Sequence, residues 1–370
     1  MGKLDHITIK GFKSIRHAEN LALRDINVVI GPNGAGKSNF IGVFSFLHAI
    51  REGKLQEYVI KAGGAENVLH FGSRATPTLS LALAFNEEQD HYQIGFISAG
   101  SDSLRPSSER AGYWGDRSYP QPYWDPKLFT TGKEAGISSS SIGGRVTEYV
   151  RSQLDSWRLY HFHDTSAASP MKKTADVNDN RFLRPDGSNL CSFLHLLKVK
   201  HPESYQLIRK SVERVAPFFD DFRLEPLQLN AKSIQLEWKH KRSDRFFDGT
   251  ALSDGTLRFI GLATLFLQPK ELRPSVILVD EPELGLHPFA ITLLASMIKQ
   301  AAVETQVIVA TQSPLLLDHF RPEDVLVVNQ VEGASEFERL DPERLGTWLE
   351  DYSLGQLWEK NELGGRPVRG

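Results

Sequence analysis

The sequence predicts an α/β fold whose core is a mainly parallel sheet, with an antiparallel β subdomain and a helical lobe added to it. Three observations carry this prediction. Runs of consecutive apolar residues at 26–30, 276–279 and 307–310 are typical of strands buried on both faces. Segments with apolar residues at helical spacing occur between these runs. Strands and helices that alternate in this way are characteristic of parallel sheets covered by helices.

The bulk properties of the chain exclude several classes of protein. Its 370 residues are enough for one large domain or two modest ones, and 40% hydrophobic and 24% charged residues are typical of a globular protein. No apolar run approaches the roughly 20 residues of a membrane span, and no apolar core of a signal peptide follows Met1. A net charge of −3 does not by itself indicate nucleic acid. We therefore expect a cytoplasmic protein without a membrane partner, in which the single cysteine, Cys191, is a packed thiol.

The first half of the chain is expected to contain four strands and one long helix. Alternating apolar residues predict a first strand that ends near Phe12, and 26–30 forms the second. A helix is predicted over 38–50, and further strands over 78–85 and 91–97. The segment 98–144 is rich in Gly, Ser, Pro and aromatic residues, which predicts a long loop or a small surface subdomain.

The second half of the chain alternates helices and strands. Helices are expected over 145–157, over 189–219 with an interruption at Pro202, and over 254–267, and another begins at Pro288 because proline suits the first helical turn. No internal repeat and no heptad stretch long enough for a coiled-coil arm is present. The predicted strands cover 159–163, 222–227, 234–238, 276–279 and 307–310, before a small β-containing tail.

A phosphate-binding motif lies between the strand at 26–30 and the helix at 38–50. The segment 31–38 reads Gly-Pro-Asn-Gly-Ala-Gly-Lys-Ser and matches G-x-x-x-x-G-K-[ST] in full. Lys37 is expected to contact the β- and γ-phosphates of ATP and Ser38 to bind Mg²⁺. A chance turn before a helix is the alternative, and the correct flanks argue against it. The predicted nucleotide-binding residues here are Asn33, Gly34, Ala35, Gly36, Lys37, Ser38 and Asn39.

An acidic pair follows the buried run at 276–279. The carboxyl ends of parallel strands are where ligands bind in such sheets, so Asp280 and Glu281 are expected at that edge. We expect Asp280 to hold Mg²⁺ and Glu281 to orient or deprotonate the attacking water. Two solvated acids that end a strand are the alternative.

With these motifs the chain resembles the ABC-type ATPase superfamily, a group of P-loop NTPases, in its SMC/RecF/OLD-like branch. More narrowly, it is similar to stand-alone ATPases described as OLD- or RecF-like AAA ATPases. The resemblance covers essentially the whole chain. The segments that carry it are Ile-Thr-Ile-Lys-Gly-Phe-Lys-Ser at 7–14, Leu-Ser-Asp-Gly-Thr at 252–256, Glu-Pro-Glu-Leu-Gly-Leu-His-Pro at 281–288, Ala-Thr-Gln-Ser-Pro at 310–314, and the ending at 351–367.

The resemblance implies an architecture and further site residues. It implies one ATPase head over 1–370, with lobe insertions at about 98–144, rich in loops, and 170–250, a helical lid. It places Lys13 and Ser14 beside the adenine and ribose. Ser253 and Gly255, in a signature at a helix start, are implied to cap the γ-phosphate of ATP on a second subunit, in a head-to-tail homodimer. A plain helix N-cap is the alternative for Ser253.

Two features depart from the family pattern. Gln312 stands where this branch usually has a histidine in the switch loop; it can still donate a hydrogen bond but cannot become charged, so slow hydrolysis is expected. A polar residue that ends a strand is the alternative. No clear Q-loop glutamine is present, and the best positional candidate is the segment Tyr-His-Phe-His-Asp at 160–164, which contains His161 and His163. On one face of a strand these histidines could bind a metal, lie near Mg–ATP, or simply pack.

The function that the sequence favours is an ATP-driven switch that acts on DNA or on an effector protein such as a nuclease, in genome maintenance or anti-phage defence. A nucleotide-sensing scaffold with little turnover and a transporter-type nucleotide-binding subunit are the alternatives. An aromatic-rich loop around Trp114, Tyr119, Tyr123 and Trp124 could stack on bases, hold a partner, or pack on its own lobe. Basic residues that could contact phosphates, or form ordinary solvated faces, are Lys172, Lys173, Arg181, Arg184, Lys239, Lys241, Arg242 and Arg245.

Overall fold

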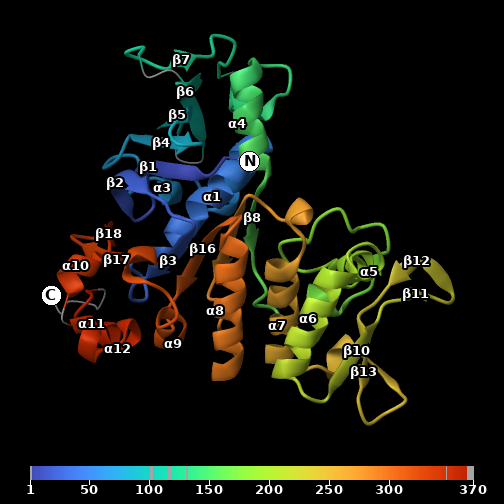
Figure 1. Ribbon diagram of the computed structural model, residues 1–370. Coiled ribbons are helices and arrows are strands. Elements are labelled where there is room, and N and C mark those ends of the chain that lie inside the picture. Colours follow the sequence, from blue (N-terminus) through green and yellow to red (C-terminus); the bar gives the residue numbers. More distant parts are fainter. Residues whose placement is uncertain (1, 101–102, 116–117, 131, 347, 365–370) are drawn as a thin grey trace. The chain divides into compact units, whose positions relative to one another are not determined.

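A computed structural model describes residues 2–100, 103–115, 118–130, 132–346 and 348–364 (Figure 1). The chain divides into two compact units, the first formed by 1–157 and 321–370 and the second by 158–320. The predicted α/β class is confirmed, because parallel strand pairs occur beside antiparallel sheets and a group of helices. Part of the family-like ending, 365–367, lies outside the described residues.

The first unit contains a six-stranded sheet of antiparallel pairs with the order β2-β1-β4-β5-β6-β7. The strand predicted at the start of the chain and those predicted at 78–85 and 91–97 are confirmed. The prediction of a loop over 98–144 is wrong for 104–113, where β6 pairs with β5 along its whole length. The strands are β1 Leu4–Phe12, β2 Ile15–Ala22, β4 Thr78–Phe85, β5 Asp90–Ser98, β6 Leu104–Tyr113 and β7 Tyr123–Trp124.

A second group of strands in the first unit supports the phosphate motif. β3 Ile26–Ile30 runs parallel to β17 Val325–Val331, which pairs antiparallel with β18 Ala334–Arg339. The helix after β3 begins at the motif, as predicted. The helices of this unit are α1 Lys37–Arg51, α2 Leu55–Lys61, α3 Ala65–Val68, α4 Arg145–Asp155, α10 Pro342–Leu345, α11 Trp348–Asp351 and α12 Leu354–Glu359.

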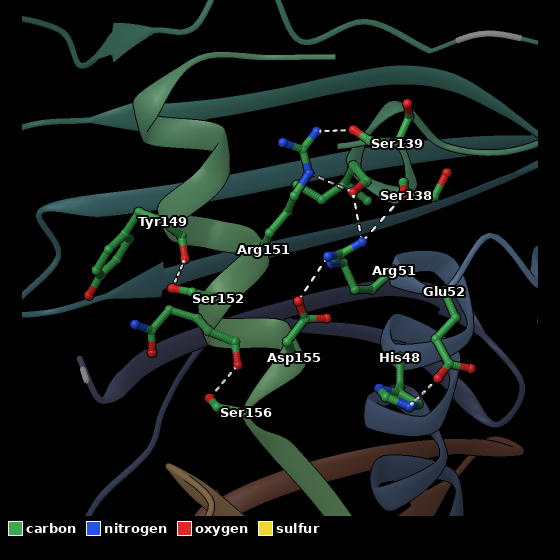
Figure 2. A network of polar contacts seen from close by, with 12 residues as sticks. His48, Arg51, Glu52, Ser138, Ser139, Tyr149, Arg151, Ser152, Asp155 and Ser156 are labelled. Carbon is green, nitrogen blue, oxygen red and sulfur yellow. Dashed lines mark hydrogen bonds and ion pairs between the residues drawn. The ribbon is translucent and has the colours of Figure 1, made fainter. Parts of the chain in front are cut away.

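Arginine side chains fix the loop between β7 and α4 (Figure 2). Arg51 on α1 pairs with Asp155 on α4 at 2.8 Å and donates to the carbonyl of Ser138 at 3.3 Å. Arg151 on α4 donates to the carbonyl of Ile137 at 2.9 Å. These carbonyls belong to a short 3-10 helix, Gly136–Ser138, and buried carbonyls need hydrogen-bond donors. The two guanidinium groups therefore supply the donors that hold this short helix against α1 and α4.

The second unit combines helices with parallel strands and small antiparallel sheets. α6 packs on α7 and α7 on α8, and these helices lie side by side (Figure 1). β15 and β16 pair in parallel, whereas β9, β11 and β12 form one antiparallel sheet and β10, β13 and β14 another. The helices are α5 Leu190–Lys200, α6 Pro202–Val215, α7 Asp254–Leu267, α8 Pro288–Ala302 and α9 Pro314–Leu317. The strands are β9 Ala175–Asp176, β10 Phe219–Arg223, β11 Pro226–Leu227, β12 Asn230–Ile234, β13 Glu237–His240, β14 Phe246–Asp248, β15 Val276–Asp280 and β16 Gln306–Thr311.

Several predicted boundaries are confirmed and others shift. The break at Pro202 and the helix start at Pro288 are confirmed, and α7 has the predicted ends. The strand predicted over 159–163 instead ends early, because β8 covers Trp157–Tyr160. Cys191 is buried, as expected. Within the part of the chain that the structure describes, no helix is long and apolar enough to cross a membrane.

Candidate nucleotide-binding site

The phosphate loop connects β3 to the first turn of α1. Gly34 and Gly36 have φ values of 81° and 114°, in the left-handed region that favours glycine, and Gly36 is the N-cap of α1. A Cβ at Gly36 would lie 2.0 Å from Ser335 Oγ, so a side chain there would also collide. The loop therefore presents backbone N–H groups at a helix N-terminus, the arrangement that binds phosphate.

The lysine of the motif lies against its own loop. Lys37 is buried, and its ammonium group donates to the carbonyl oxygens of Gly31 at 2.7 Å and Pro32 at 3.1 Å. A bound phosphate would be a charged acceptor in place of these neutral carbonyls. Of the other predicted residues, Asn33, Gly34 and Ser38 are exposed and Ala35 is buried.

A hydroxyl and amide network joins the loop to the predicted adenine-proximal residues. Ser335 Oγ donates to the carbonyl of Ala35 at 2.6 Å and lies within hydrogen-bond distance of Ser14 Oγ, at 2.7 Å, and Ser14 Oγ accepts from Asn39 Nδ2 at 2.7 Å. Burial lowers the pKa of the neighbouring Lys13. The structure thus brings together Ser14 and Asn39, both of which the sequence analysis selected as nucleotide-binding residues. Ser335 was not predicted, because it lies 300 residues from Ala35 and belongs to no motif.

The predicted catalytic residues meet at the ends of β15 and β16. Asp280 is the last residue of β15, and Glu281 follows with a φ of 43°. The Glu281 backbone N–H donates to the carbonyl of Ala310 at 2.8 Å. The side-chain amide of Gln312 donates to Glu281 Oε1. A non-glycine residue in the left-handed region is strained, and such strain is concentrated at functional sites.

Glu283 is a third carboxyl at this edge, and sequence reasoning did not select it. Its Oε1 accepts from the hydroxyl of Thr311 and from the backbone N–H of Gln312 at 3.4 Å. Its Oε2 is buried and has no hydrogen-bond partner among the described residues. Burial raises the pKa of the Glu283 carboxyl above its ordinary value, and the charge of Glu281 adds to this effect. The Glu-Pro-Glu spacing was the only available signal for it.

The signature residues begin α7. Ser253 is the N-cap of this helix, and its Oγ accepts from the backbone N–H of Thr256 at 3.2 Å. A Cβ at Gly255 would lie 2.6 Å from the carbonyl oxygen of Gly285, which gives glycine a packing reason in this position. On the next turn Arg258 donates from Nε to the carbonyl of Phe162 at 2.9 Å. The N-cap interpretation of Ser253 therefore holds within the chain, and it leaves the residue exposed.

The two candidate histidines do not lie on a strand. β8 ends at Tyr160, and the rings of His161 and His163 are 6.3 Å apart between centroids. Burial lowers the pKa of His161, His163 lowers it further, and Asp280 opposes this shift. In the described ranges no group of three or more His, Cys, Asp or Glu side chains could hold a metal ion. Histidine ligation of a metal therefore has no support here.

The predicted site residues divide between the two units. The phosphate loop and its supporting residues belong to the first unit, and the acidic pair, the switch residue and the signature belong to the second. The first set is Lys13, Ser14, Asn33, Gly34, Ala35, Gly36, Lys37, Ser38 and Asn39. The second set is Ser253, Gly255, Asp280, Glu281 and Gln312.

Comparison with known proteins identifies the family. A family described as "AAA domain, putative AbiEii toxin, Type IV TA system" matches residues 26–318, which include the phosphate loop, the signature, the acidic pair and Gln312 but not Lys13 and Ser14. The chain belongs to this family. A search of curated proteins found no match.

Solved structures agree with this AAA-domain assignment at the level of the fold. An SMC head bound to the C-terminal winged-helix domain of ScpA matches with a TM-score of 0.60 and 17% identity, over 92% of this chain and 98% of that one. An SMC head with an extended coiled coil, bound to the C-terminal domain of ScpA from Pyrococcus furiosus, matches with a TM-score of 0.57 and 16% identity, over 95% and 99%. At the level of the fold, the expected likeness to SMC heads is confirmed.

Proposed function

We propose that this AAA-family chain is a molecular switch that binds and hydrolyses ATP. The observation that carries the proposal is the phosphate loop, where Gly34 and Gly36 adopt left-handed backbone conformations directly before the N-terminus of α1. This backbone presents N–H donors to a polyphosphate, and the buried Lys37 supplies a compact positive charge. The same residues argue against a chance turn, which has no need of a buried lysine.

Metal binding and catalysis are assigned to residues that the loop and the strand ends provide. Ser38 and Asp280 are proposed to hold Mg²⁺, which would neutralise negative charge on the phosphates of ATP. Hydroxyl and carboxylate oxygens are the ligands that Mg²⁺ prefers. Glu281 is proposed to accept the proton of the attacking water, with Gln312 holding its carboxylate in place.

A head-to-tail homodimer is part of the proposal. Ser253 and Gly255 begin α7, and an exposed serine beside backbone N–H groups at a helix N-terminus suits an anion. In the proposed dimer these groups contact the γ-phosphate bound by the second subunit. The single head with lobe insertions at about 98–144 and 170–250 remains part of the same proposal.

The output of the switch is proposed to be a change of grip on DNA or on an effector protein such as a nuclease, in the cytoplasm. The family description names a toxin–antitoxin system, which favours a defence process over housekeeping. The basic residues give DNA modest support: Arg184 pairs with Asp179 at 2.6 Å and Lys241 with Glu213 at 2.6 Å, so part of their charge is neutralised. An effector protein is therefore favoured over DNA as the partner on which the switch acts.

A nucleotide-sensing scaffold is the second candidate, and one observation favours it. Gln312 already donates to Glu281 and carries no charge, so it supplies no cation to the γ-phosphate in the transition state. Single-turnover hydrolysis separates the two candidates, because a scaffold binds ATP without producing ADP on the timescale of the assay.

The proposed function is tested by calorimetric ATP binding and by phosphate release, with Lys37→Ala as the comparison. The variant is expected to lose ATP binding, because no other residue of the motif carries a positive charge. Equal ATP affinity in the two proteins would remove the phosphate-loop assignment. A thermal melt with the same midpoint shows that the fold is kept.

A further inference from the structure

Phe71 is an aromatic residue that the fold holds out from the surface. It lies between α3 and β4, it is 68% exposed, and its φ is 55°. A bulky residue in the left-handed region is an outlier, and such strain persists only where the surrounding structure imposes it. Neither burial of the ring nor backbone preference explains the position of Phe71.

The backbone next to Phe71 is tied to the turn that contains Lys13. The backbone N–H of His70 donates to the carbonyl of Gly11 at 3.1 Å, and the Lys13 N–H donates to the carbonyl of Val68 at 2.8 Å. The His70 ring bonds through Nδ1 to the carbonyl of Lys13 at 2.7 Å. These hydrogen bonds hold the turn at Lys13 to the segment that contains His70. The position of Phe71 is therefore fixed relative to the turn that leads to Ser14.

A second set of contacts ties the same ring to the phosphate loop. A Cβ at Gly333 would lie 2.7 Å from Phe71 Cζ, so the ring packs against the turn before β18. Two residues further on, Ser335 donates to the carbonyl of Ala35 in the phosphate loop. The Ser335 backbone N–H also donates to the carbonyl of Ser14 at 2.8 Å. One short segment thus supports both the exposed ring and the loop.

We propose that Phe71 is the platform on which the base of the bound nucleotide stacks. The ring has His70 on one side, with centroids 4.3 Å apart, and Gly333 at its edge, and most of its surface stays open. Stacking of a base on an aromatic ring needs such an open face and tolerates different bases. This inference rests on the proposed function, because it requires the triphosphate to lie in the phosphate loop.

The neighbouring polar residues leave this role to Phe71. The Ser14 hydroxyl is already hydrogen-bonded to both Asn39 and Ser335, so it is committed to positioning the loop. The Lys13 ammonium group lies over the ring of Phe12 at 5.6 Å. Aromatic stacking therefore assigns to Phe71 the contact with the base, while Ser14 acts as a positioning residue.

The test compares ATP with inorganic triphosphate, each with Mg²⁺, in calorimetric titrations of the full chain. Phe71→Ala is expected to weaken ATP binding by about 5- to 100-fold and to leave triphosphate binding unchanged. Phe71→Tyr should bind both ligands as the wild type does. Phe129→Ala is the matched control, because Phe129 is 54% exposed on the same unit and should affect neither ligand.

A second variant gives a direct signal from the ring. The tryptophan fluorescence of Phe71→Trp should change when ATP is added and should stay unchanged when triphosphate is added. The far-ultraviolet circular dichroism of this variant should match that of the wild type. Equal ATP affinity in the wild type and Phe71→Ala overturns the proposal, as does an equal loss of both ligands. Failure of the wild type to bind either ligand instead overturns the proposed function itself, so the two failures are distinguishable.

Discussion

The side-chain amide of Gln312 donates a hydrogen bond to the carboxylate of Glu281. The two residues follow neighbouring parallel strands, where Asp280 is in register with Ala310. Because that register fixes the ends of both strands, the two side chains meet beside the acidic pair. Gln312 is therefore positioned to orient Glu281, in addition to any contact with phosphate.

Glu281→Gln is expected to keep ATP bound and to trap a closed dimer. The amide keeps the shape of the carboxylate and can still accept from Gln312, but it cannot accept a proton from water. Turnover should fall by about two to four orders of magnitude. Chromatography with ATP and Mg²⁺ should show more dimer than for the wild type. Glu271→Gln, an exposed acid in the same unit, should hydrolyse normally, and a wild-type rate in Glu281→Gln would rule out the catalytic role.

Gln312→His is expected to keep or raise hydrolysis. An imidazole also donates to Glu281, and it can carry a positive charge toward the γ-phosphate. The rate of the variant should then depend on pH around the ordinary histidine pKa of about 6.5, a dependence that the wild-type amide cannot produce. Gln312→Ala is the control and should lose rate by removing the donor. An unfolded Gln312→His protein would show that the amide is structural.

Ser253→Arg is expected to block turnover while each subunit still binds ATP. Arginine adds bulk to an exposed helix start that the proposal places in the dimer interface. The substitution also removes an N-cap, which costs about 1 kcal/mol. Ser253→Ala removes the same cap without the bulk. A thermal melt of this variant measures the loss of helix stability alone, which is thereby separated from the loss of dimer closure.

Mixing Ser253→Arg with Lys37→Ala subunits tests whether catalysis uses two chains. A mixed dimer contains one composite site with a wild-type Lys37 from one chain and a wild-type Ser253 from the other. Partial recovery of phosphate release on mixing is expected. Normal hydrolysis by Ser253→Arg alone, or loss of ATP binding by its monomer, would point to a single-subunit P-loop enzyme instead.

Glu283→Gln is expected to remove a pH dependence of stability. Burial raises the Glu283 pKa above 4.5 in the folded state, so the folded protein binds this proton more tightly than the unfolded chain. The contribution to stability is therefore fully present below about pH 4.5 and is lost as the pH rises through the raised folded pKa. A tenfold difference in proton affinity between the folded and unfolded chains corresponds to about 1.4 kcal/mol of unfolding free energy.

Chemical denaturation at a series of pH values measures this effect. As the pH rises from about 4.5 to neutrality, the wild type should lose unfolding free energy relative to Glu283→Gln. The subtraction cancels the other carboxyl groups that titrate in the same range. A difference that is constant with pH would mean that Glu283 has the same pKa in the folded protein and in the unfolded chain.

Local patterns in the sequence predicted the parts of this protein that local forces control. The phosphate loop needs glycine at Gly34 and Gly36 because of its left-handed backbone, and such a requirement is visible in the motif itself. The ends of α7 agree with the prediction because Ser253 caps the helix and its apolar residues share one pattern. Pro202 and Pro288 begin helices for the same kind of local reason.

Contacts between distant segments decided the rest. The Gly, Ser, Pro and aromatic content of 98–144 predicts a long loop or a small surface subdomain, and only the pairing of β6 with β5 makes 104–113 a strand. Three further contacts likewise leave no periodic signal along the chain. They are the hydrogen bond from Ser335 to Ala35, the hydrogen bond from the Thr311 hydroxyl to Glu283, and the packing of Phe71 against Gly333. Hydrogen bonds and packing between segments remote in sequence depend on the register of strands and the paths of turns. The sequence by itself therefore determined the phosphate-binding and acidic motifs, whereas the tertiary structure decided which side chains support them.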